Sequence, residues 1–286
     1  MARVDSLSIK LEPLLTSNDK LAEEYGKVIE NLQTRSLAFM LKNQNLSGNP
    51  NAGSVEAKRF ANVTAQNYGT ARGNGYAGKV GALPVTIAIN DNKEWIEEIE
   101  AKDLEMYGVG GLIERRTANH ERAMERYFDT VFFAKAVSSG TAITVDGTPT
   151  IDDEIEKAIE TVETVKNDYV DGVNRDEIVV VMTPAIYGKL RNKINNSFNS
   201  NDLGTVRSYE GGIFNNARVY SSVRLPSGVD YVVMHDGAVA QPIRTSIYNP
   251  KPIPLSDAVA MGIFAYSGTE AVEPDLIFYK GEVVSQ

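Results

Sequence analysis

The clearest pattern in the chain is an apolar stripe of helical period that runs from Tyr107 to Val137. Apolar residues recur there at every third or fourth position, while arginine and glutamate fill the opposite side. The stripe consists of Leu112, Ile113, Ala123, Met124, Tyr127, Phe128, Val131, Phe132 and Ala134. At about 1.5 Å per residue, the segment predicts a helix about 45 Å long, which would span a whole domain.

A second helical pattern covers residues 17–42, where Ser17 or Asn18 could cap the start. The stretch that follows it, NQNLSGNPNAGS, contains two glycines and a proline, which end a helix. We expect residues 17–42 to form an arm that is separate from the main core.

Residues 54–90 carry strand-forming stretches on either side of a glycine-rich connection. The glycines of this connection are Gly69, Gly73, Gly75, Gly78 and Gly81. Glycine weakens helices and strands because it loses more backbone freedom on ordering than other residues do. The pattern therefore predicts a long, flexible hairpin. Because the hairpin is too polar to bury itself, we expect it to need another surface to lie on.

The middle of the chain predicts a small α/β layer. Apolar positions over residues 151–169 indicate a second amphipathic helix, and the run DEIVVVM after it indicates a buried strand. In TPAIYGKLRNKI, Thr183 is placed as an N-cap and Pro184 as the first helical residue.

The remaining stretches favour strands. IFNNARVYSS and VDYVVMHDG each read as a strand, and the tail beyond NPKPIP is apolar and rich in strand-forming residues. Residues 93–106, around Trp95, fit either a strand or a helix.

Size and composition suit one large domain or two intertwined ones, with 286 residues of which 42% are hydrophobic. The absence of cysteine excludes disulfides and thiolate metal sites, and two distant histidines disfavour zinc. No apolar run approaches the ~18–20 residues that span a bilayer, and the N-terminus lacks the apolar region of a secretion signal. We therefore expect no membrane partner and a cytoplasmic location.

The net charge of −9 argues against a protein that coats duplex DNA. The charge is uneven, with ten basic and seven acidic residues over 1–80 but ten acidic against three basic over 151–177. This polarity suits contact between copies through opposite faces. The alternative is a pair of solvated surfaces.

The stretch ARGNGYAGKVGALPV matches the dinucleotide pattern G-x-G-x-x-G at Gly73, Gly75 and Gly78. Phosphate binding needs a helix directly after such a loop, because the helix N-terminus holds the anion. Here a strand-like sequence with Pro84 follows, and Val80 replaces the hydroxyl that would hold Mg²⁺. The motif therefore indicates a pliable hairpin tip, and we expect no cofactor.

Other catalytic patterns are equally weak. His120 lies beside the apolar stripe of the long helix, which predicts a packed or capped imidazole. His235, in MHDGA, reads as part of a turn after a strand. No G-x-S-x-G elbow is present. We predict no catalytic residue and no metal site, and a protein that is not an enzyme.

The order of these elements resembles that of the major capsid proteins of tailed bacteriophages, which have the Hong Kong 97-type fold. The resemblance covers about Leu21 to Tyr279 and rests on element order, without a short diagnostic motif. It is carried by YGTARGNGYAGKVGALPVTIAIN, by KEWIEEIEAKDLEMYGVGGLIERRTANHERAMERYFDTVFFAKA, by TIDDEIEKAIETVETVKNDYV with DEIVVVMTPAIYGKLRN, and by DYVVMHDGAVAQPIRTSIYNPKPIPLSDAVAMGIFAYSGTEAVEPDLIFYK.

This resemblance implies an α+β, Hong Kong 97-like capsid fold in four parts. They are an N-terminal arm with a helix (1–52), an extended hairpin loop (53–90), a peripheral domain with a long spine helix (91–140 and 246–286) and an axial α/β domain (141–245). It implies self-assembly into pentamers and hexamers that form an icosahedral head around phage DNA, without sequence-specific binding. The protein would be part of the virion capsid and assemble in the bacterial host cytoplasm.

The charge asymmetry also suggests an intersubunit contact. Arg72 and Lys79 at the hairpin tip could meet acids of the adjoining copy, among Glu94, Glu97, Glu98 and Asp103. Some relatives crosslink through a lysine on this loop. The loop lysines here are Lys58 and Lys79, and no motif supports a crosslink.

The resemblance also bears on partners and alternatives. Because only about 50 residues precede the hairpin, we expect a separate scaffolding protein, and a portal and a decoration protein are further partners. The main alternative is an encapsulin-type nanocompartment shell with the same fold. A phage tail protein and an enzyme are less favoured.

Overall fold

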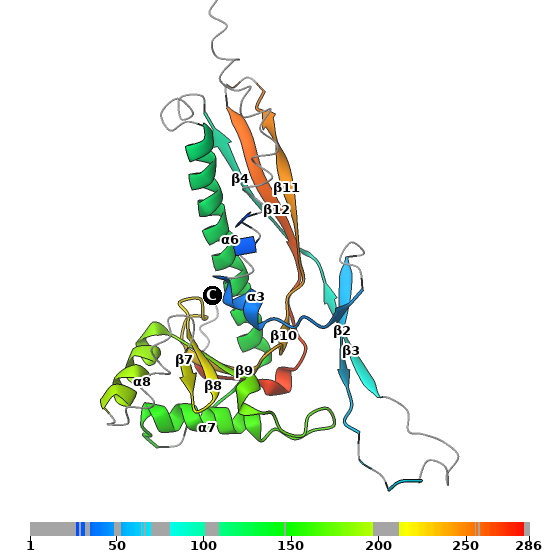
Figure 1. Cartoon of the computed structure of the whole chain (residues 1–286), viewed down its shortest axis with the longest axis vertical. Coiled ribbons are helices and arrows are strands. Elements are labelled where there is room, and N and C mark those ends of the chain that lie inside the picture. Colours follow the sequence, from blue (N-terminus) through cyan, green and yellow to red (C-terminus); the bar gives the residue numbers. More distant parts are fainter. Residues whose placement is uncertain are drawn as a thin grey trace, which may run out of the picture.

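The structure is a computed structural model of an elongated chain. It describes residues 27–28, 30–31, 35–48, 53–63, 65, 67–69, 81–100, 109–145, 147–196, 212–254, 256 and 258–282. Figure 1 shows a long helix and a narrow sheet at one end, a second sheet with two helices at the other, and a hairpin that projects sideways.

The long helix predicted from the apolar stripe is confirmed as α6, Val109–Ser139. A three-stranded antiparallel sheet runs alongside it, in the order β11 (Ile243–Pro252), β12 (Val259–Ser267), β4 (Asp91–Ile99) (Figure 1). The sequence around Trp95 fitted either a strand or a helix, and the structure shows a strand there, β4, which ends at Ile99. Trp95 packs its ring against Tyr127 and Phe128 of α6, with centroids 5.9 and 6.1 Å apart.

A six-stranded sheet forms the other end, in the order β5-β14-β9-β6-β8-β7. Its strands are β5 (Thr141–Ala142), β6 (Ile178–Met182), β7 (Gly212–Phe214), β8 (Ala217–Ser221), β9 (Val229–His235) and β14 (Ile277–Gly281). The predicted strand–turn–helix unit is confirmed, because β6 leads through Thr183 into α8, Pro184–Asn196. The carbonyl of Thr183 accepts a hydrogen bond from the amide of Tyr187 at 2.9 Å, as expected for the residue that begins a helix.

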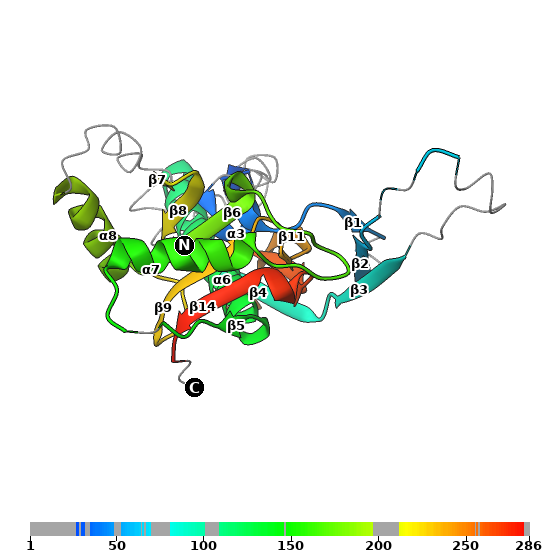
Figure 2. The ribbon, with the colours of Figure 1, turned by 90° about the horizontal axis from the view of Figure 1, so that it is seen from below.

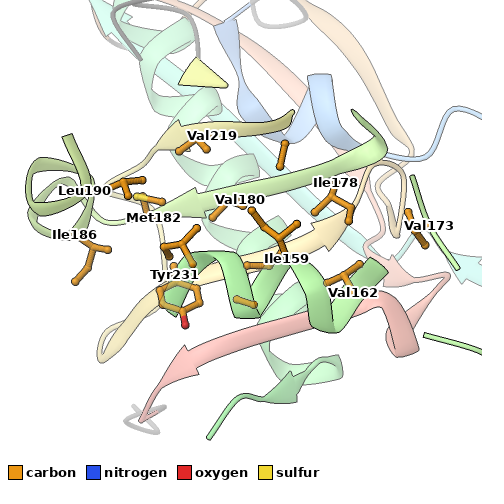
Figure 3. Packing of buried hydrophobic residues seen from close by; sticks show 14 of the residues in the cluster. Ile159, Val162, Val173, Ile178, Val180, Met182, Ile186, Leu190, Val219 and Tyr231 are labelled. Carbon is orange, nitrogen blue, oxygen red and sulfur yellow. The ribbon is translucent and has the colours of Figure 1, made fainter. Parts of the chain in front are cut away.

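All five residues of β6 are buried, because both faces of this central strand are covered. Ile178, Val180 and Met182 pack with α7 (Ile151–Glu163) and α8 (Figure 3). Val179 and Val181 face the opposite way and join the cluster around α6. This two-sided burial explains why the sequence shows a continuous apolar run in place of an alternating one.

The second amphipathic helix ends earlier than predicted. α7 stops at Glu163, so Val165 and Tyr169 lie in the loop that follows. Oδ1 of Asn167 accepts hydrogen bonds from the backbone amides of Tyr169 and Val170, at 2.8 and 2.9 Å. Such local side-chain bonds compete with helical bonds and favour a turn. We refer to residues 164–172 as the α7 loop.

The stretch IFNNARVYSS is a hairpin and not the single strand predicted. β7 pairs with β8 across Asn215 and Asn216, whose φ angles are +47° and +72°. Two consecutive residues with positive φ make the type of two-residue turn that fits the twist of a hairpin, and asparagine tolerates this conformation.

The N-terminal helix is interrupted and is not separate from the core. Residues 27–28, 30–31 and 35 are helical, Ser36 is extended (φ −72°, ψ 127°), and α3 (Leu37–Leu41) begins anew. Ser36 and the amide of Ala38 both donate to Asp129 of α6, at 2.5 and 2.9 Å. Since Ala38 and Leu41 are buried in the cluster around α6, this part of the arm belongs to the core. Residues 1–26 lie outside the described residues.

Strand pairing also divides the tail. The predicted peripheral domain includes all of residues 246–286, yet β14 pairs with β9 and β5 in the six-stranded sheet. Of the strands in this tail, β12 and most of β11 belong to the three-stranded sheet. No helix in the described part of the chain is both long and apolar enough to cross a membrane.

Candidate functional site

The predicted hairpin is confirmed by two antiparallel strands, β2 (Ser54–Phe60) and β3 (Ala82–Ala88). The short strand β1 (Leu46–Ser47) extends its sheet. The inward side chains at the start of the hairpin are buried against Ala240 and Val272 of the same chain: Val55, Ala57 and Ile87. At its root, the surface on which the hairpin lies is therefore part of the same chain.

Beyond its root the hairpin leaves the body, as both views show (Figures 1 and 2). Large apolar side chains are exposed along this part: Phe60 by 60%, Val63 by 95%, Tyr68 by 96% and Leu83 by 43%. These apolar side chains lie along one projection and are open to solvent in the single subunit. Phe60 lies opposite Ala82 on the outward face of the strand pair.

The glycine-rich tip is described only at its edges. Gly69 has a φ of +94° with open space around it, and Gly81 lies close to Ala61. Positive φ favours glycine over other residues, which explains Gly69 as a turn residue. The predicted site residues Arg72, Lys79, Asp103, Gly73, Gly75 and Gly78 lie outside the described residues.

The acids predicted as intersubunit partners on β4 point to opposite sides of the sheet. Glu94 and Glu98 are exposed, and Ile96 between them is 41% exposed. Glu97 faces α6, where it accepts hydrogen bonds from Arg116 and lies 3.4 Å from Nε2 of His120. Glu97 is thus already engaged within its own subunit, because residues alternate between the two faces of a strand.

The histidines occupy the places that the sequence predicted. His120 lies on α6 and is packed there, with 2% of its surface exposed. Burial lowers its pKa, although Glu97 opposes this. His235 ends β9 before a turn at Gly237, and its Nδ1 lies 2.7 Å from Oε2 of Glu273. That bond raises the pKa of His235. The described residues contain no group of three or more side chains suited to a metal ion.

An open groove lies between residues 143–145 and α7. Its charged lining residues are Glu154, Lys157 and Glu160, and Glu154 is paired with Lys280 of β14 at 2.6 Å. The groove lining includes no histidine.

A charged cluster lies at the hairpin root that the sequence does not predict. Arg59 follows Val55 and Ala57 on the inward face of β2, yet it is only 7% exposed. Its Nη2 lies 3.1 Å from Asp275, and its guanidinium lies 4.8 Å from the ring centroid of Tyr169. An arginine at an inward strand position was the one signal in the sequence, but its partners lie more than a hundred residues away along the chain.

The comparisons with known proteins agree with this fold. The family described as phage capsid protein matches residues 94–277. The sequence matches no curated protein. Among solved structures, a chain of Mycobacterium phage Che8 is 20% identical with a TM-score of 0.60, covering 80% of this chain and 84% of that one. A chain of the mature capsid of bacteriophage PhiM1 is 16% identical with a TM-score of 0.57, covering 86% of this chain and 87% of that one.

A virus-like particle from Pyrococcus furiosus is 11% identical with a TM-score of 0.59 and covers 92% of this chain and 98% of that one. At these identities the likeness establishes the fold. The α+β, Hong Kong 97-like capsid fold predicted from the sequence is thereby confirmed.

Proposed function

Since the chain belongs to the phage capsid protein family and is a structural protein of the virion capsid, we propose that it assembles into the pentamers and hexamers of an icosahedral head. The head would enclose phage DNA without sequence-specific binding. We place the three-stranded sheet and α6 in a peripheral domain, and the six-stranded sheet with α7 and α8 in an axial domain near the five- and six-fold axes.

The observation that carries this proposal is the projecting hairpin with its exposed Phe60, Val63 and Tyr68. A single subunit gains no burial from these side chains, whereas a shell supplies a neighbouring subunit at every position. Contacts of this kind run from one subunit to the next in one direction, and they close into rings when the rotation allows it.

We propose that the hairpin of one copy lies over the outer face of the three-stranded sheet of the next. This face carries the exposed Glu94, Ile96, Glu98 and Tyr266. Arg72 and Lys79 at the hairpin tip would approach the two glutamates, with Asp103 as a further candidate. Opposite charges at such a contact guide the partners into register.

Expression of the chain followed by negative-stain microscopy tests the assembly itself, and we expect closed shells or capsomer rings. The contact is tested by reversing the tip charges in the double variant Arg72→Glu with Lys79→Glu, which should impair assembly. Adding Glu94→Lys and Glu98→Lys should restore particles. Unimpaired particles from the double variant would exclude the contact.

The remaining partners follow from the same proposal. A separate scaffolding protein and a portal would direct assembly in the host cytoplasm, and a decoration protein would bind the finished shell. We propose no catalytic role and no covalent crosslink through Lys58 or Lys79. A ladder of multimers after boiling in detergent would contradict the last point.

An encapsulin-type compartment is the second candidate. The observation that favours it is the Pyrococcus furiosus virus-like particle, which is covered over 98% of its length. The contents of particles purified from the native source distinguish the two functions. Nuclease-protected DNA supports the phage head, whereas particles that hold a protein and no DNA support the compartment.

A further inference from the structure

Arg59 is a buried charged residue on the inward face of β2, where the other buried residues are apolar. The preceding inward positions of β2, Val55 and Ala57, are 3% and 1% exposed and pack against Val272. The Arg59 side chain is 5% exposed although it stands where the hairpin leaves the body. Burying a guanidinium without a partner is strongly unfavourable, so its surroundings must compensate for the lost water.

Two groups from distant parts of the chain enclose this guanidinium. Oδ2 of Asp275 lies 3.1 Å from Nη2, and the Tyr169 ring centroid lies 4.8 Å from Cζ. The same Asp275 oxygen accepts a bond from Nδ2 of Asn167 at 3.0 Å. The α7 loop therefore contributes an aromatic face and a second donor, while Asp275 contributes the opposite charge.

The segments that carry the partners of Arg59 are attached to the body of the subunit. Asp275 lies in the short helix η3 (Pro274–Leu276), next to Leu276, which is 1% exposed in the core of the six-stranded sheet. Two residues earlier, Glu273 pairs with His235 of β9 at 2.7 Å. In the α7 loop, the carbonyl of Asp168 accepts a hydrogen bond of 2.9 Å from the amide of Asn62, which lies just past the end of β2.

We propose that Arg59, Asp275 and Tyr169 form a clamp that fixes the direction of the hairpin in the free subunit. The clamp closes close to where the hairpin leaves its own body. The Asn62 amide makes one further bond to the α7 loop, while Phe60 and Val63 are already 60% and 95% exposed. A change of angle at this point displaces the whole projecting part. The part of the proposal that concerns a neighbouring copy rests on the proposed function, whereas the clamp itself does not.

The clamp has a consequence for assembly. A hairpin held in its bound direction loses less conformational freedom when it meets a partner, so association is stronger for the same contacts. Weakening the clamp should leave the subunit folded but raise the concentration at which particles form.

Hydrogen–deuterium exchange on the unassembled full chain tests the clamp directly. Asp275→Asn removes the charge that compensates Arg59, and amides of β2 and β3 at residues 58–60 and 82–83 should exchange roughly ten- to a hundredfold faster. Arg59→Lys should act in the same direction, because lysine lacks the planar group that stacks on tyrosine. Exchange in β6 should stay unchanged and report that the fold persists.

Matched variants separate the clamp from general effects of the loop. Asp171→Asn breaks the exposed pair with Lys166 in the same α7 loop and should change nothing. Tyr169→Phe keeps the aromatic face and should behave like the native chain, whereas Tyr169→Leu should loosen the hairpin. If Asp275→Asn and Tyr169→Leu both leave the amide exchange of residues 58–60 and 82–83 unchanged, the clamp is refuted.

The particle-forming concentration, measured by light scattering, gives the second readout. We expect a rise of about tenfold for Asp275→Asn and none for Asp171→Asn. If the native chain forms no particles while Asp275→Asn still speeds exchange, the clamp stands and the proposed function fails. If particles form and exchange does not respond, the proposed function stands and the clamp fails.

Discussion

At the scale of single residues, Asp129 joins the N-terminal segment to the long helix α6. Its carboxylate is 4% exposed and accepts bonds from the Ser36 hydroxyl and the Ala38 amide. Burial raises the pKa of Asp129, and these two bonds oppose the rise. One side chain of α6 thus interrupts the N-terminal helix and anchors its last turn to the core.

We predict that Asp129→Ala lowers the free energy of unfolding by about 2–4 kcal/mol, because two donors lose a charged acceptor in a buried site. Urea denaturation followed by circular dichroism measures the change. The neighbouring Thr130→Ala is the control. Thr130 is exposed and bonds only the Arg126 carbonyl, so its removal should stay within about 0.5 kcal/mol. Equal effects of both variants would contradict the role of Asp129.

The two histidines have pKa shifts of opposite sign for physical reasons that the structure makes plain. His235 gains a carboxylate partner in Glu273, with Glu177 and Asp236 nearby, and its pKa is raised. Burial lowers the pKa of His120. The folded state therefore binds a proton on His235 more tightly than the unfolded state does, and binds one on His120 less tightly.

We predict opposite pH dependence for substitutions at the two positions. The stability that His235 contributes is fully present below its unfolded pKa of about 6.5 and is lost as pH rises through its folded value, so His235→Gln should cost most at low pH. His120 destabilises the native chain as pH falls below about 6.5, so His120→Gln should cost least there. Urea denaturation of both variants at about three pH values between 5 and 8 measures the direction of each pH dependence. Parallel profiles for the two variants would contradict this assignment.

At the scale of elements, a glycine allows two neighbouring strands to approach each other closely. A Cβ on Gly262 of β12 would lie 2.5 Å from the Trp95 carbonyl oxygen and 2.9 Å from Cα of Ile96, both on β4. By contrast, Gly188 of α8 has nothing within 4 Å of the corresponding position. The same substitution should therefore have opposite effects in the two elements.

We predict that Gly262→Ala destabilises the chain by about 1–3 kcal/mol, because the strands must move apart. Gly188→Ala should stabilise it by about 0.5–1 kcal/mol, because alanine is the better helix former. Thermal unfolding of both variants gives the comparison. A stabilising Gly262→Ala would show that β12 and β4 have more room than the structure indicates.

At the scale of the whole molecule, charge determines how the subunit meets nucleic acid. The chain carries a net charge of −9, so phosphate contacts cannot supply general affinity for duplex DNA. Enclosed DNA would then be confined by the shell rather than held by its wall. This is compatible with a container that must release what it holds.

We predict that unassembled subunits cause no shift of duplex DNA in gel electrophoresis at an ionic strength of about 0.15 M. The variant Glu94→Lys with Glu98→Lys, which lowers the negative charge of the exposed sheet face, serves as the comparison. A shift by the native chain, equal for unrelated DNA sequences, would contradict passive enclosure.

The amino-acid sequence by itself determined the elements whose patterns are long or complete within one segment. The apolar stripe of α6, the buried run of β6 and the paired strands of the hairpin follow from periodicity, because every residue that defines them is near in sequence. Their order along the chain was enough to identify the capsid fold.

Only the tertiary structure decided the contacts between segments that are far apart in sequence. Asp129 breaks a helix that local propensity favours, Glu97 turns inward to Arg116, and Arg59 meets Asp275 across 216 positions. No local pattern encodes these pairs, because they arise when packing of the apolar faces brings the segments together and buried charges must then find partners.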